Sequence, residues 1–324
     1  MSTSALDQLK QWTTVVADSS DLDAIAKFRP LDATTNPSLI TAAAKQTENR
    51  ALIESAFAEV DATGLSTEAR IEAAIDILTV KLGVEILKLI EGRVSTEVDA
   101  SLSFDTAATV KKAKELLALY AGYGISSDRI LIKIASTWEG IQAARLLESE
   151  GIHCNLTLLF NMAQAQACAD AKVTLISPFV GRILDWYKKA EGVEHYPTDK
   201  DPGVLSVRAI YQHYKQHGIQ TQVMGASFRS IDQVLALAGC DLLTIAPQLL
   251  EGLSTDTRLV EQALVAGTAS SHTAEAIDEE TFRLHLQQDP MASQLLQGGI
   301  DGFIQAREQL HSLLATTFAD ALSA

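Results

Sequence analysis

The sequence feature that most constrains the fold is the alternation of two kinds of segment along the chain. Short segments rich in β-branched and apolar residues, typical of buried strands, are mostly separated by longer stretches with helical periodicity. We predict eight strands, at residues 13–17, 33–35, 94–98, 130–135, 154–159, 173–177, 222–226 and 242–246. Strands that alternate with helices indicate a parallel sheet. Eight such units indicate that the sheet closes into a (β/α)8 barrel.

An open, doubly wound α/β sheet is the alternative to the barrel. No Gly-x-Gly-x-x-Gly motif follows a predicted strand, which disfavours the dinucleotide-binding form of that sheet. The 324 residues fit one barrel, because α/β barrels often use more than about 200 residues as a single unit. We therefore predict an α/β fold, a (β/α)8 TIM barrel, with a single domain over residues 1–324.

Two stretches are predicted to add helices to the barrel. Residues 38–91 are too long for one crossover helix, so we expect two or three helices between strands two and three. One of them covers residues 69–90, where an apolar stripe recurs at steps of three and four: Ile71, Ile75, Leu78, Leu82, Ile86 and Leu89. From about residue 279 onward we expect helices that pack outside or across the barrel.

Composition excludes several functional classes. The net charge is −15 and no Lys/Arg-rich run occurs, so we expect no nucleic-acid partner. No run of about 18 apolar residues indicates a membrane span, and the first twelve residues lack the apolar core of a secretory signal. The three cysteines have apolar neighbours and lack metal-ligand spacing, which predicts reduced core thiols. Together these features predict a cytoplasmic protein.

Side-chain alternation places one lysine inside the barrel. In the strand at 130–135 the isoleucines share one face, which suits the helix layer, so Lys133 points inward. A buried lysine is rare unless it is paired or functional. Burial lowers the pKa of an amine, and a neutral amine is a usable nucleophile. A structural ion pair is the alternative role.

The same test directs further polar side chains inward, near the C-terminal ends of their strands. They are Glu97, Asn155 and Thr157, with Asp18, Thr34, Asn36, Ser177 and Phe179 at strand ends. Active sites of barrel enzymes occupy that end. Each residue has a structural alternative: Glu97 as a partner of Lys133, Asp18 as a helix cap, Ser177 as part of a turn, and Asn155 or Thr157 as plain hydrogen bonders.

Two arginines suit a phosphate at the same rim. Arg182 follows Ser177-Pro-Phe-Val-Gly181, and Arg229 follows Gly225-Ala-Ser-Phe228. The planar guanidinium matches phosphate oxygens, and on an acidic protein a phosphate ligand needs local cations. Surface ion pairs are the alternative role for both.

The chain resembles the transaldolase family, of the bacterial and eukaryotic type, over nearly its whole length. The resemblance rests on these segments, in order: Thr13-Thr-Val-Val-Ala-Asp18, Asp32-Ala-Thr-Thr-Asn-Pro-Ser38, Gly92-Arg-Val-Ser-Thr-Glu-Val-Asp99, Ile130-Leu-Ile-Lys-Ile-Ala-Ser-Thr-Trp138, Cys154-Asn-Leu-Thr-Leu-Leu-Phe160, Ile176-Ser-Pro-Phe-Val-Gly-Arg-Ile-Leu-Asp-Trp186, Met224-Gly-Ala-Ser-Phe-Arg229 and Gln288-Asp-Pro-Met-Ala292.

The resemblance implies a role for each matching residue. Lys133 matches the Schiff-base lysine and Asp18 the acid/base at the C4 hydroxyl. Glu97 and Thr157 match a relay that shares a water. The remaining matches are substrate-binding: Thr34, Asn36, Asn155, Ser177 and Phe179, with Arg182, Ser227 and Arg229 at the phosphate. It also implies transfer of a dihydroxyacetone unit between sugar phosphates in the non-oxidative pentose phosphate pathway, without cofactor or metal, by a homodimer.

Departures and rivals define what stays open. Gln166 stands where relatives often have Arg, Asn161 and Met162 are unusual, and residues 294–301 are less basic than the family suggests. Residues 251–279 are divergent and polar.

The nearest rival function is that of a fructose 6-phosphate aldolase. Such aldolases tend to have Gln and Tyr where this chain has Glu97 and Phe179. A non-catalytic sugar-phosphate-binding barrel is the rival from another class; it has no use for an interior lysine.

Overall fold

The computed structural model describes residues 3–60, 64–267 and 276–319. Its centre is a closed barrel in which the strands follow one another in chain order and every neighbouring pair is parallel, including β8 with β1. The strands are β1 (Thr14–Asp18), β2 (Asp32–Thr34), β3 (Val94–Glu97), β4 (Ile130–Ala135), β5 (Cys154–Leu159), β6 (Leu175–Pro178), β7 (Gln222–Gly225) and β8 (Leu242–Ile245). The predicted barrel is confirmed, and the open sheet is wrong.

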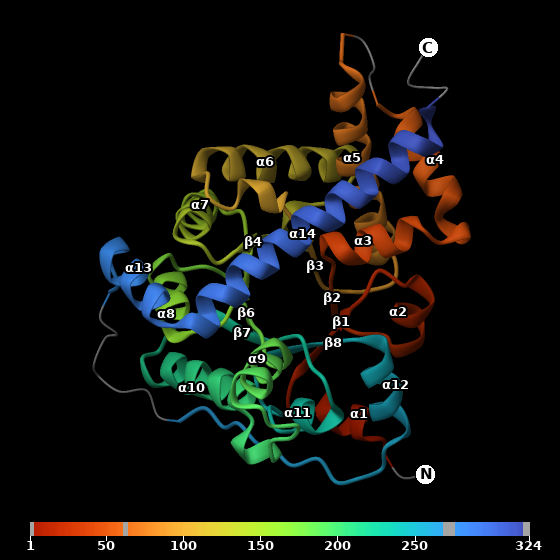
Figure 1. The fold of residues 1–324 in the computed structure, drawn as a ribbon. Helices are drawn as coiled ribbons and strands as arrows, with labels where there is room; N and C mark the ends of the chain where they lie inside the picture. The colour runs from red at the N-terminus through yellow and green to blue at the C-terminus, as the bar shows by residue number, and fades with distance from the viewer. Residues whose placement is uncertain (1–2, 61–63, 268–275, 320–324) are drawn as a thin grey trace.

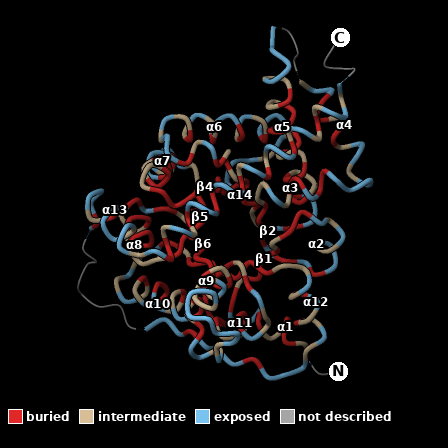
Figure 2. Tube along the Cα trace, in the orientation of Figure 1, coloured by how far each residue is buried: buried red, intermediate tan, exposed pale blue. Residues whose placement is uncertain are grey.

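The strand positions agree closely with the prediction. The bounds of β4 and β5 match exactly the ranges predicted for them, while the start or end of every other strand moves by one or two residues. The strands are buried on both faces, as a parallel barrel requires. Figure 2 shows this as a ring of buried residues at the centre.

Two apolar groups hold the barrel together. One lies between strands and helices and includes Ile130, Ile132 and Ile134 of β4. The other fills the barrel interior with one side chain from each of five strands: Val16, Leu131, Leu175, Met224 and Leu242. Lys133 follows Leu131 on the inward face of β4, so this plug keeps water from reaching the lysine from below.

Helices surround the barrel (Figure 1). They are α1 (Ala5–Leu9), α2 (Leu22–Phe28), α6 (Thr106–Gly122), α7 (Trp138–Ser149), α8 (Met162–Asp170), α9 (Gly181–Glu191), α10 (Pro202–Gln216), α11 (Ile231–Leu235) and α12 (Pro247–Thr255). Asn161 caps α8 reciprocally with Gln164, which gives the unusual Asn a local reason. All three cysteines are buried free thiols, as predicted. Within the described ranges, no helix is long and apolar enough to cross a membrane.

The insertion after β2 contains α3 (Pro37–Ala44), α4 (Arg50–Ala58) and α5 (Thr67–Leu87), as predicted. They form an apolar cluster of their own with the end of the C-terminal helix. The predicted stripe of α5 is buried from Ile71 to Ile86, but the helix ends at Leu87 and Leu89 is 39% exposed. Leu89 belongs to the turn before β3, so including it in the stripe was wrong.

The C-terminal residues cross the mouth of the barrel, one of the two predicted arrangements. Helix α13 (Glu279–Gln288) packs on α8, and α14 (Pro290–Thr317) runs diagonally in front of the strands in Figure 1, from α9 to the α3–α5 insertion. Of the divergent stretch 251–279, residues 268–275 lie outside the described part of the chain.

Strand β5 carries an irregularity that corrects one prediction. Simple alternation sends Leu158 outward to the helix layer. Instead, the register of β5 against β6 shifts between Leu156 and Leu159, and Leu158 has φ 52°. This bulge turns Leu158 toward α14, where a Cβ on Gly299 would lie only 2.6 Å from its side chain. A glycine at 299 therefore lets α14 approach the barrel.

Candidate active site

A cavity of about 170 Å³ opens at the C-terminal ends of the strands. Its walls come from seven strands or the loops after them, all but β3, and from α9 and α14. The lining residues are Asp18, Thr34, Asn36, Lys133, Thr157, Ser177, Phe179, Arg182, Ala226, Ser227, Phe228, Arg229, Thr244, Ala246 and Phe303. Ten of the twelve residues proposed from the sequence are in this set; Glu97 and Asn155 lie behind the wall.

Lys133 is the only lysine among the residues that line this cavity. Its side chain is 7% exposed, and its Nζ lies 3.3 Å from Oε2 of Glu97, whose side chain is 3% exposed. Nζ also donates a hydrogen bond to the carbonyl of Thr35, at 3.0 Å. The parallel register of β3 and β4 sets this arrangement, because it pairs Glu97 with Lys133. The amine is thus held in one place beside a carboxylate that can exchange a proton with it.

Asp18 ends β1 at the rim of the same cavity. Thr34 donates a hydrogen bond from its Oγ1 to Oδ1 of Asp18, at 3.2 Å. The hydroxyls of Thr34 and Thr244 lie 2.8 Å apart and share a second hydrogen bond. The cap of helix α2 is Asp21, whose side chain accepts from the amide of Ala24. The helix-cap alternative for Asp18 is therefore wrong.

Both carboxylates have a pKa above the ordinary range for their type. Burial raises the pKa of Asp18, and the positive charge of Lys133, the hydrogen bond from Thr34 and the charge of Arg182 oppose that rise. Burial likewise raises the pKa of Glu97, against the charge of Lys133. A carboxylate with a raised pKa holds a proton more readily, which suits groups that accept and return one.

Further polar side chains lie in the cavity wall or just behind it. Asn155, fully buried, donates from Nδ2 to Oγ of Ser95 and accepts from Oγ of Ser177, at 3.0 and 2.6 Å. These bonds orient Ser177 at the wall. Thr157 faces the cavity, and its buried hydroxyl has no hydrogen-bond partner among the described residues. Asn36 caps α3 through its Oδ1, which fixes the side chain at the rim.

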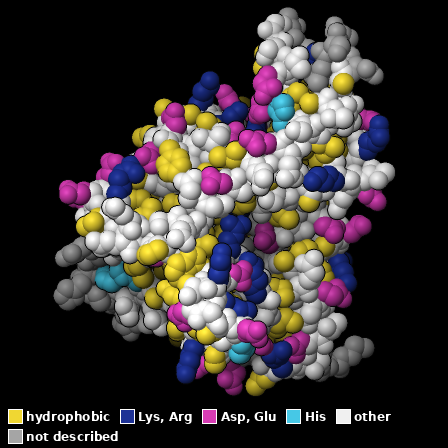
Figure 3. Space-filling model, in the orientation of Figure 1, with side chains coloured by type: hydrophobic (Ala, Val, Ile, Leu, Met, Phe, Trp, Pro, Cys, Tyr) yellow, Lys and Arg dark blue, Asp and Glu magenta, His cyan; other side chains and the backbone are white. Residues whose placement is uncertain are grey.

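Two guanidinium groups also line the cavity. Arg182, at the start of α9, lies over the ring of Phe179, 4.9 Å from its centroid, and 5.8 Å from that of Phe303. Arg229 follows β7, and Asp185 of α9 accepts from its Nε at 3.0 Å. Burial and the neighbouring charge of Arg229 lower the pKa of Arg182. Figure 3 shows dark-blue basic side chains gathered beside α9, below the diagonal of α14.

A close approach of backbone brings the segments that carry the two arginines together. Ser227 has φ 61°, and its carbonyl accepts from the amide of Gly181 at 2.6 Å. A Cβ on Gly181 would lie 2.3 Å from that carbonyl and 2.7 Å from Cγ of Arg229. Gly181 is therefore required where the start of α9 touches the loop after β7.

The comparisons with known proteins identify the family. The profile described as transaldolase/fructose-6-phosphate aldolase matches residues 15–314. The chain belongs to this family. A transaldolase of Thermosynechococcus vestitus is 55% identical over 95% of this chain and 80% of its own length. Transaldolases of Prochlorococcus marinus (strain MIT 9312) and Cellvibrio japonicus are each 54% identical, over 96% of this chain and 95% and 98% of their own lengths.

The sequence prediction lacks five residues that line this cavity, Ala226, Phe228, Thr244, Ala246 and Phe303, and it also lacks Asp185, which pairs with Arg229. Thr244 lies at the end of β8 and faces the cavity; alternation along 242–246, anchored on buried Leu242, could have found it. Phe303 comes from α14, whose place over the mouth no local pattern shows. Asp185 pairs with Arg229 from one turn beyond Arg182 on α9, a spacing that suggests a shared face only after the helix is placed.

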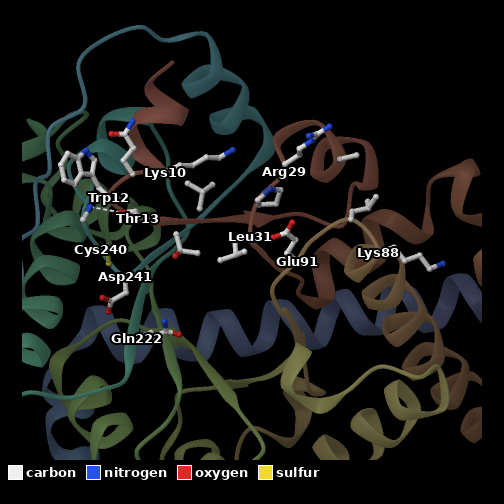
Figure 4. A pocket seen from close by; sticks show the side chains of 17 residues that line it. Lys10, Trp12, Thr13, Arg29, Leu31, Lys88, Glu91, Gln222, Cys240 and Asp241 are labelled. Atoms are coloured by element: carbon white, nitrogen blue, oxygen red, sulfur yellow. Dashed lines mark hydrogen bonds between the residues drawn. The ribbon is translucent and has the colours of Figure 1, made fainter. Parts of the chain in front are cut away.

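A larger hollow lies at the other end of the barrel. Its volume is about 940 Å³, and it is lined by the N-terminal ends of β1 and β7 and the loops before β1, β2, β3 and β8. Figure 4 shows Lys10, Arg29 and Lys88 spread around its rim rather than converging. Lys10 donates to the carbonyl of Phe28 and Lys88 to Glu85. This hollow offers no focused set of groups, so its size does not make it the active site.

One group of metal-type ligands occurs among the described residues, at Glu68, Glu72 and His311 on α5 and α14. None of these three residues lines the cavity described above. Arg307 donates from Nη2 to Glu72 at 2.5 Å, and its positive charge opposes a metal ion there.

Proposed function

We propose that this protein is a transaldolase that moves a dihydroxyacetone unit between sugar phosphates through a Schiff base on Lys133. In the proposed reaction sedoheptulose 7-phosphate and glyceraldehyde 3-phosphate give erythrose 4-phosphate and fructose 6-phosphate, reversibly. One observation carries the proposal: a lysine buried inside the barrel, 3.3 Å from Glu97, lines the same cavity as Asp18. Family membership and the names of the relatives support it.

The proposed chemistry begins at the amine. Lys133 gives a proton to Glu97, and its neutral Nζ attacks the C2 carbonyl of the ketose. The resulting carbinolamine takes up a proton and loses water, which leaves a protonated imine. The raised pKa of Glu97 makes this carboxylate a good proton carrier for both steps. The buried hydroxyl of Thr157 fits a water shared with Glu97, the relay that the resemblance implies.

Cleavage then uses Asp18. The C4 hydroxyl gives its proton to the Asp18 carboxylate as the C3–C4 bond breaks, so that C4 leaves as an aldehyde. The bonding electrons move into the imine and form an enamine, so the imine takes the place of a metal or cofactor as electron sink. The enamine attacks the acceptor aldose, and Asp18 returns its proton to the new hydroxyl. Hydrolysis of the imine releases the product ketose.

The other proposed roles concern binding. Arg182, Arg229 and Ser227 hold the phosphate at the α9 rim. Asn36, Asn155, Ser177 and Thr34 serve the dihydroxyacetone part, and Phe179 forms an apolar wall under Arg182. Asn155 orients Ser177 by accepting a hydrogen bond from its hydroxyl. We place the enzyme in the cytoplasm, in the non-oxidative pentose phosphate pathway, and propose a homodimer.

A fructose 6-phosphate aldolase is the second candidate, because the family includes both activities. It would release dihydroxyacetone without an acceptor. Transfer is favoured because this chain resembles the transaldolases at two positions. It has Glu97 and Phe179 where the fructose 6-phosphate aldolases tend to have Gln and Tyr. A retained enamine requires that no group donates a proton to C3, and the ring of Phe179, with no hydroxyl, cannot do so.

The first experiment tests the covalent step. Borohydride treatment with fructose 6-phosphate should trap a three-carbon adduct on the peptide that contains Lys133, seen by mass spectrometry. Lys133→Ala removes the amine, and the guanidinium of Lys133→Arg stays protonated. Both variants should therefore lose the adduct and the turnover. Lys215→Ala is the control, since Lys215 pairs with Asp241 at the opposite end of the barrel. An adduct on another lysine would overturn the mechanism.

The second experiment separates transfer from aldol cleavage. With fructose 6-phosphate and erythrose 4-phosphate, the enzyme should form sedoheptulose 7-phosphate and glyceraldehyde 3-phosphate. With fructose 6-phosphate alone, free dihydroxyacetone should stay well below the transfer rate. Release of dihydroxyacetone at the transfer rate without an acceptor would favour the aldolase.

A further inference from the structure

The pair of threonines beside Asp18 forms a chain of hydroxyls with one end at the proposed catalytic carboxylate. Thr34 is 2% exposed and Thr244 is 4% exposed, so neither hydroxyl exchanges freely with solvent. Thr34 Oγ1 lies 3.2 Å from Oδ1 of Asp18 and 2.8 Å from Oγ1 of Thr244. Three neighbouring strands, β8, β1 and β2, supply the three groups, so barrel closure itself creates the chain.

The direction of this chain follows from counting protons. A hydroxyl carries one hydrogen, so when Thr34 donates to the Asp18 carboxylate, Thr34 must accept from Thr244. When Asp18 is protonated the chain can reverse: Asp18 donates to Thr34, and Thr34 donates to Thr244. A pair of hydroxyls can therefore bond both forms of the carboxyl without moving a heavy atom. That property suits a group that takes a proton in one half-reaction and returns it in the other.

We infer that Thr244, acting through Thr34, is a positioning residue that holds Asp18 in place for proton transfer in both protonation states. The inference rests on the proposed function, because it requires Asp18 to be the acid/base. It also revises the role proposed above for Thr34: the one hydrogen of its hydroxyl is donated to Asp18, so Thr34 supports the carboxylate and donates no hydrogen bond to the substrate. Thr244 touches no reacting atom in this proposal.

The charges that face Asp18 come from other elements. Lys133 of β4 and Arg182 of α9 favour its ionised form, while the charge of Glu97 on β3 is coupled to it and opposes that form. Substitutions at Thr34 and Thr244 leave all three groups unchanged. A change in the pH profile of these variants can therefore be assigned to the hydroxyl chain.

The test compares three variants with a matched control. Thr244→Val removes the hydroxyl but keeps the shape, and Thr244→Ser keeps the hydroxyl. Thr221→Val is the control, because Thr221 is also 4% exposed and its hydroxyl donates one hydrogen bond, to the carbonyl of Val173, at the opposite end of the barrel. Thr34→Val removes the direct contact with Asp18.

We expect kcat of Thr244→Val to fall about three- to tenfold, the effect of one buried hydrogen bond, with KM for fructose 6-phosphate within about twofold. Thr244→Ser and Thr221→Val should keep kcat within about twofold of wild type. Thr34→Val should lose more kcat than Thr244→Val, again at retained KM. The acidic limb of its pH–activity profile should also move to higher pH. The reason is that the hydrogen bond from Thr34 favours the ionised carboxyl, so its loss raises the pKa of Asp18.

Several outcomes would overturn the inference. They are an unchanged kcat in Thr244→Val, an equal loss in Thr221→Val, an equal loss in Thr244→Ser, or a raised KM with unchanged kcat in Thr34→Val, which would indicate a substrate contact. Borohydride trapping on Lys133 distinguishes the two proposals. If Thr244→Val traps the adduct as wild type does, the imine step is intact and the kcat result judges Thr244 alone. If wild type forms no adduct, both proposals fall.

Discussion

The two ends of the barrel differ in what they do with polar groups. At the C-terminal end, Lys133, Glu97 and Asp18 are enclosed in or behind a cavity of about 170 Å³. At the N-terminal end, a hollow of about 940 Å³ is edged by charges that bond the backbone or each other, such as Lys10 with the carbonyl of Phe28 and Lys215 with Asp241. The carboxylates whose pKa is raised by burial, Asp18 and Glu97, lie at the smaller cavity.

The difference shows that the candidate active end is distinguished by polar groups that converge and are buried, rather than by the volume of its cavity. Charges that remain in water are screened and interact weakly, whereas desolvated groups held within a few ångströms strongly change each other's proton affinity. The plug of apolar side chains below Lys133, which includes Leu131, separates the two ends. Substitutions at matched positions of the two ends can break or sharpen this contrast.

The largest expected effect is at the carboxylates. Asp18→Ala should lower kcat by about 10²–10⁴-fold, because proton transfer at the C4 hydroxyl is lost, while borohydride still traps an adduct before cleavage. Asp241→Asn is the counterpart at the other end, where Asp241 accepts from Lys215 and from the amide of Val223. It should cost stability and leave kcat within about twofold. Steady-state kinetics and thermal unfolding measure both, and near-normal turnover by Asp18→Ala would remove it from the mechanism.

The arginines come next. Arg182→Ala should reduce kcat/KM by about 10–150-fold, from a loss of roughly 1.5–3 kcal/mol for a charge-assisted phosphate contact. Arg229→Ala should lose less, because Asp185 already neutralises part of its charge.

Arg29→Ala is the control for the arginines, since Arg29 is exposed at the N-terminal hollow. It should leave kcat/KM unchanged. If all three variants keep KM for fructose 6-phosphate within about twofold, the phosphate site lies elsewhere.

The pH profile should show a smaller but specific effect. Asp18 must be ionised to accept the C4 proton, so activity should fall as pH falls through its pKa. Because burial raises that pKa, the fall should occur at higher pH than for an ordinary aspartate. The measurement is kcat/KM against pH, with enzyme stability checked at each pH. A profile flat down to the ordinary aspartate range would contradict a desolvated Asp18.

The smallest effect is expected in the N-terminal hollow itself. Trp12 is 43% exposed at its edge, and Trp12→Ala should leave kcat and KM within about twofold. Kinetics with fructose 6-phosphate and erythrose 4-phosphate check this. A tenfold loss with unchanged thermal stability would show that the two ends are coupled, and the contrast drawn above would be wrong.

Sequence reasoning recovered the parts of the molecule that follow local rules. Strand alternation directed Lys133, Thr157 and Glu97 into the barrel, because the face of a strand residue follows from its position in the alternation. The register of β3 against β4 then places Glu97 beside Lys133. Strand alternation failed at Leu158, where a bulge interrupts it. Helical periodicity failed at Leu89, which lies beyond the end of its helix. Neither interruption has a sequence signal stronger than the pattern it breaks.

The missed residues share a different cause. Phe303 and Asp185 acquire their places only through contacts between distant elements, α14 over the mouth and α9 beside the loop after β7. Thr244 was within reach of the alternation rule, but its meaning depends on Thr34, 210 positions away in the chain. The pairing that closes the barrel, β8 on β1, is what brings them together.

The position of α14 has a consequence for biosynthesis. The eighth strand ends at Ile245, so the barrel's hydrogen-bonded ring is encoded well before Phe303 is made. At about 5–20 residues per second, a ribosome needs roughly 3–12 s more to reach that phenylalanine. During this interval the nascent chain holds every proposed catalytic side chain but lacks the wall that α14 provides. Truncated chains should therefore bind sugar phosphates poorly, which would leave little unfinished enzyme engaged with substrate.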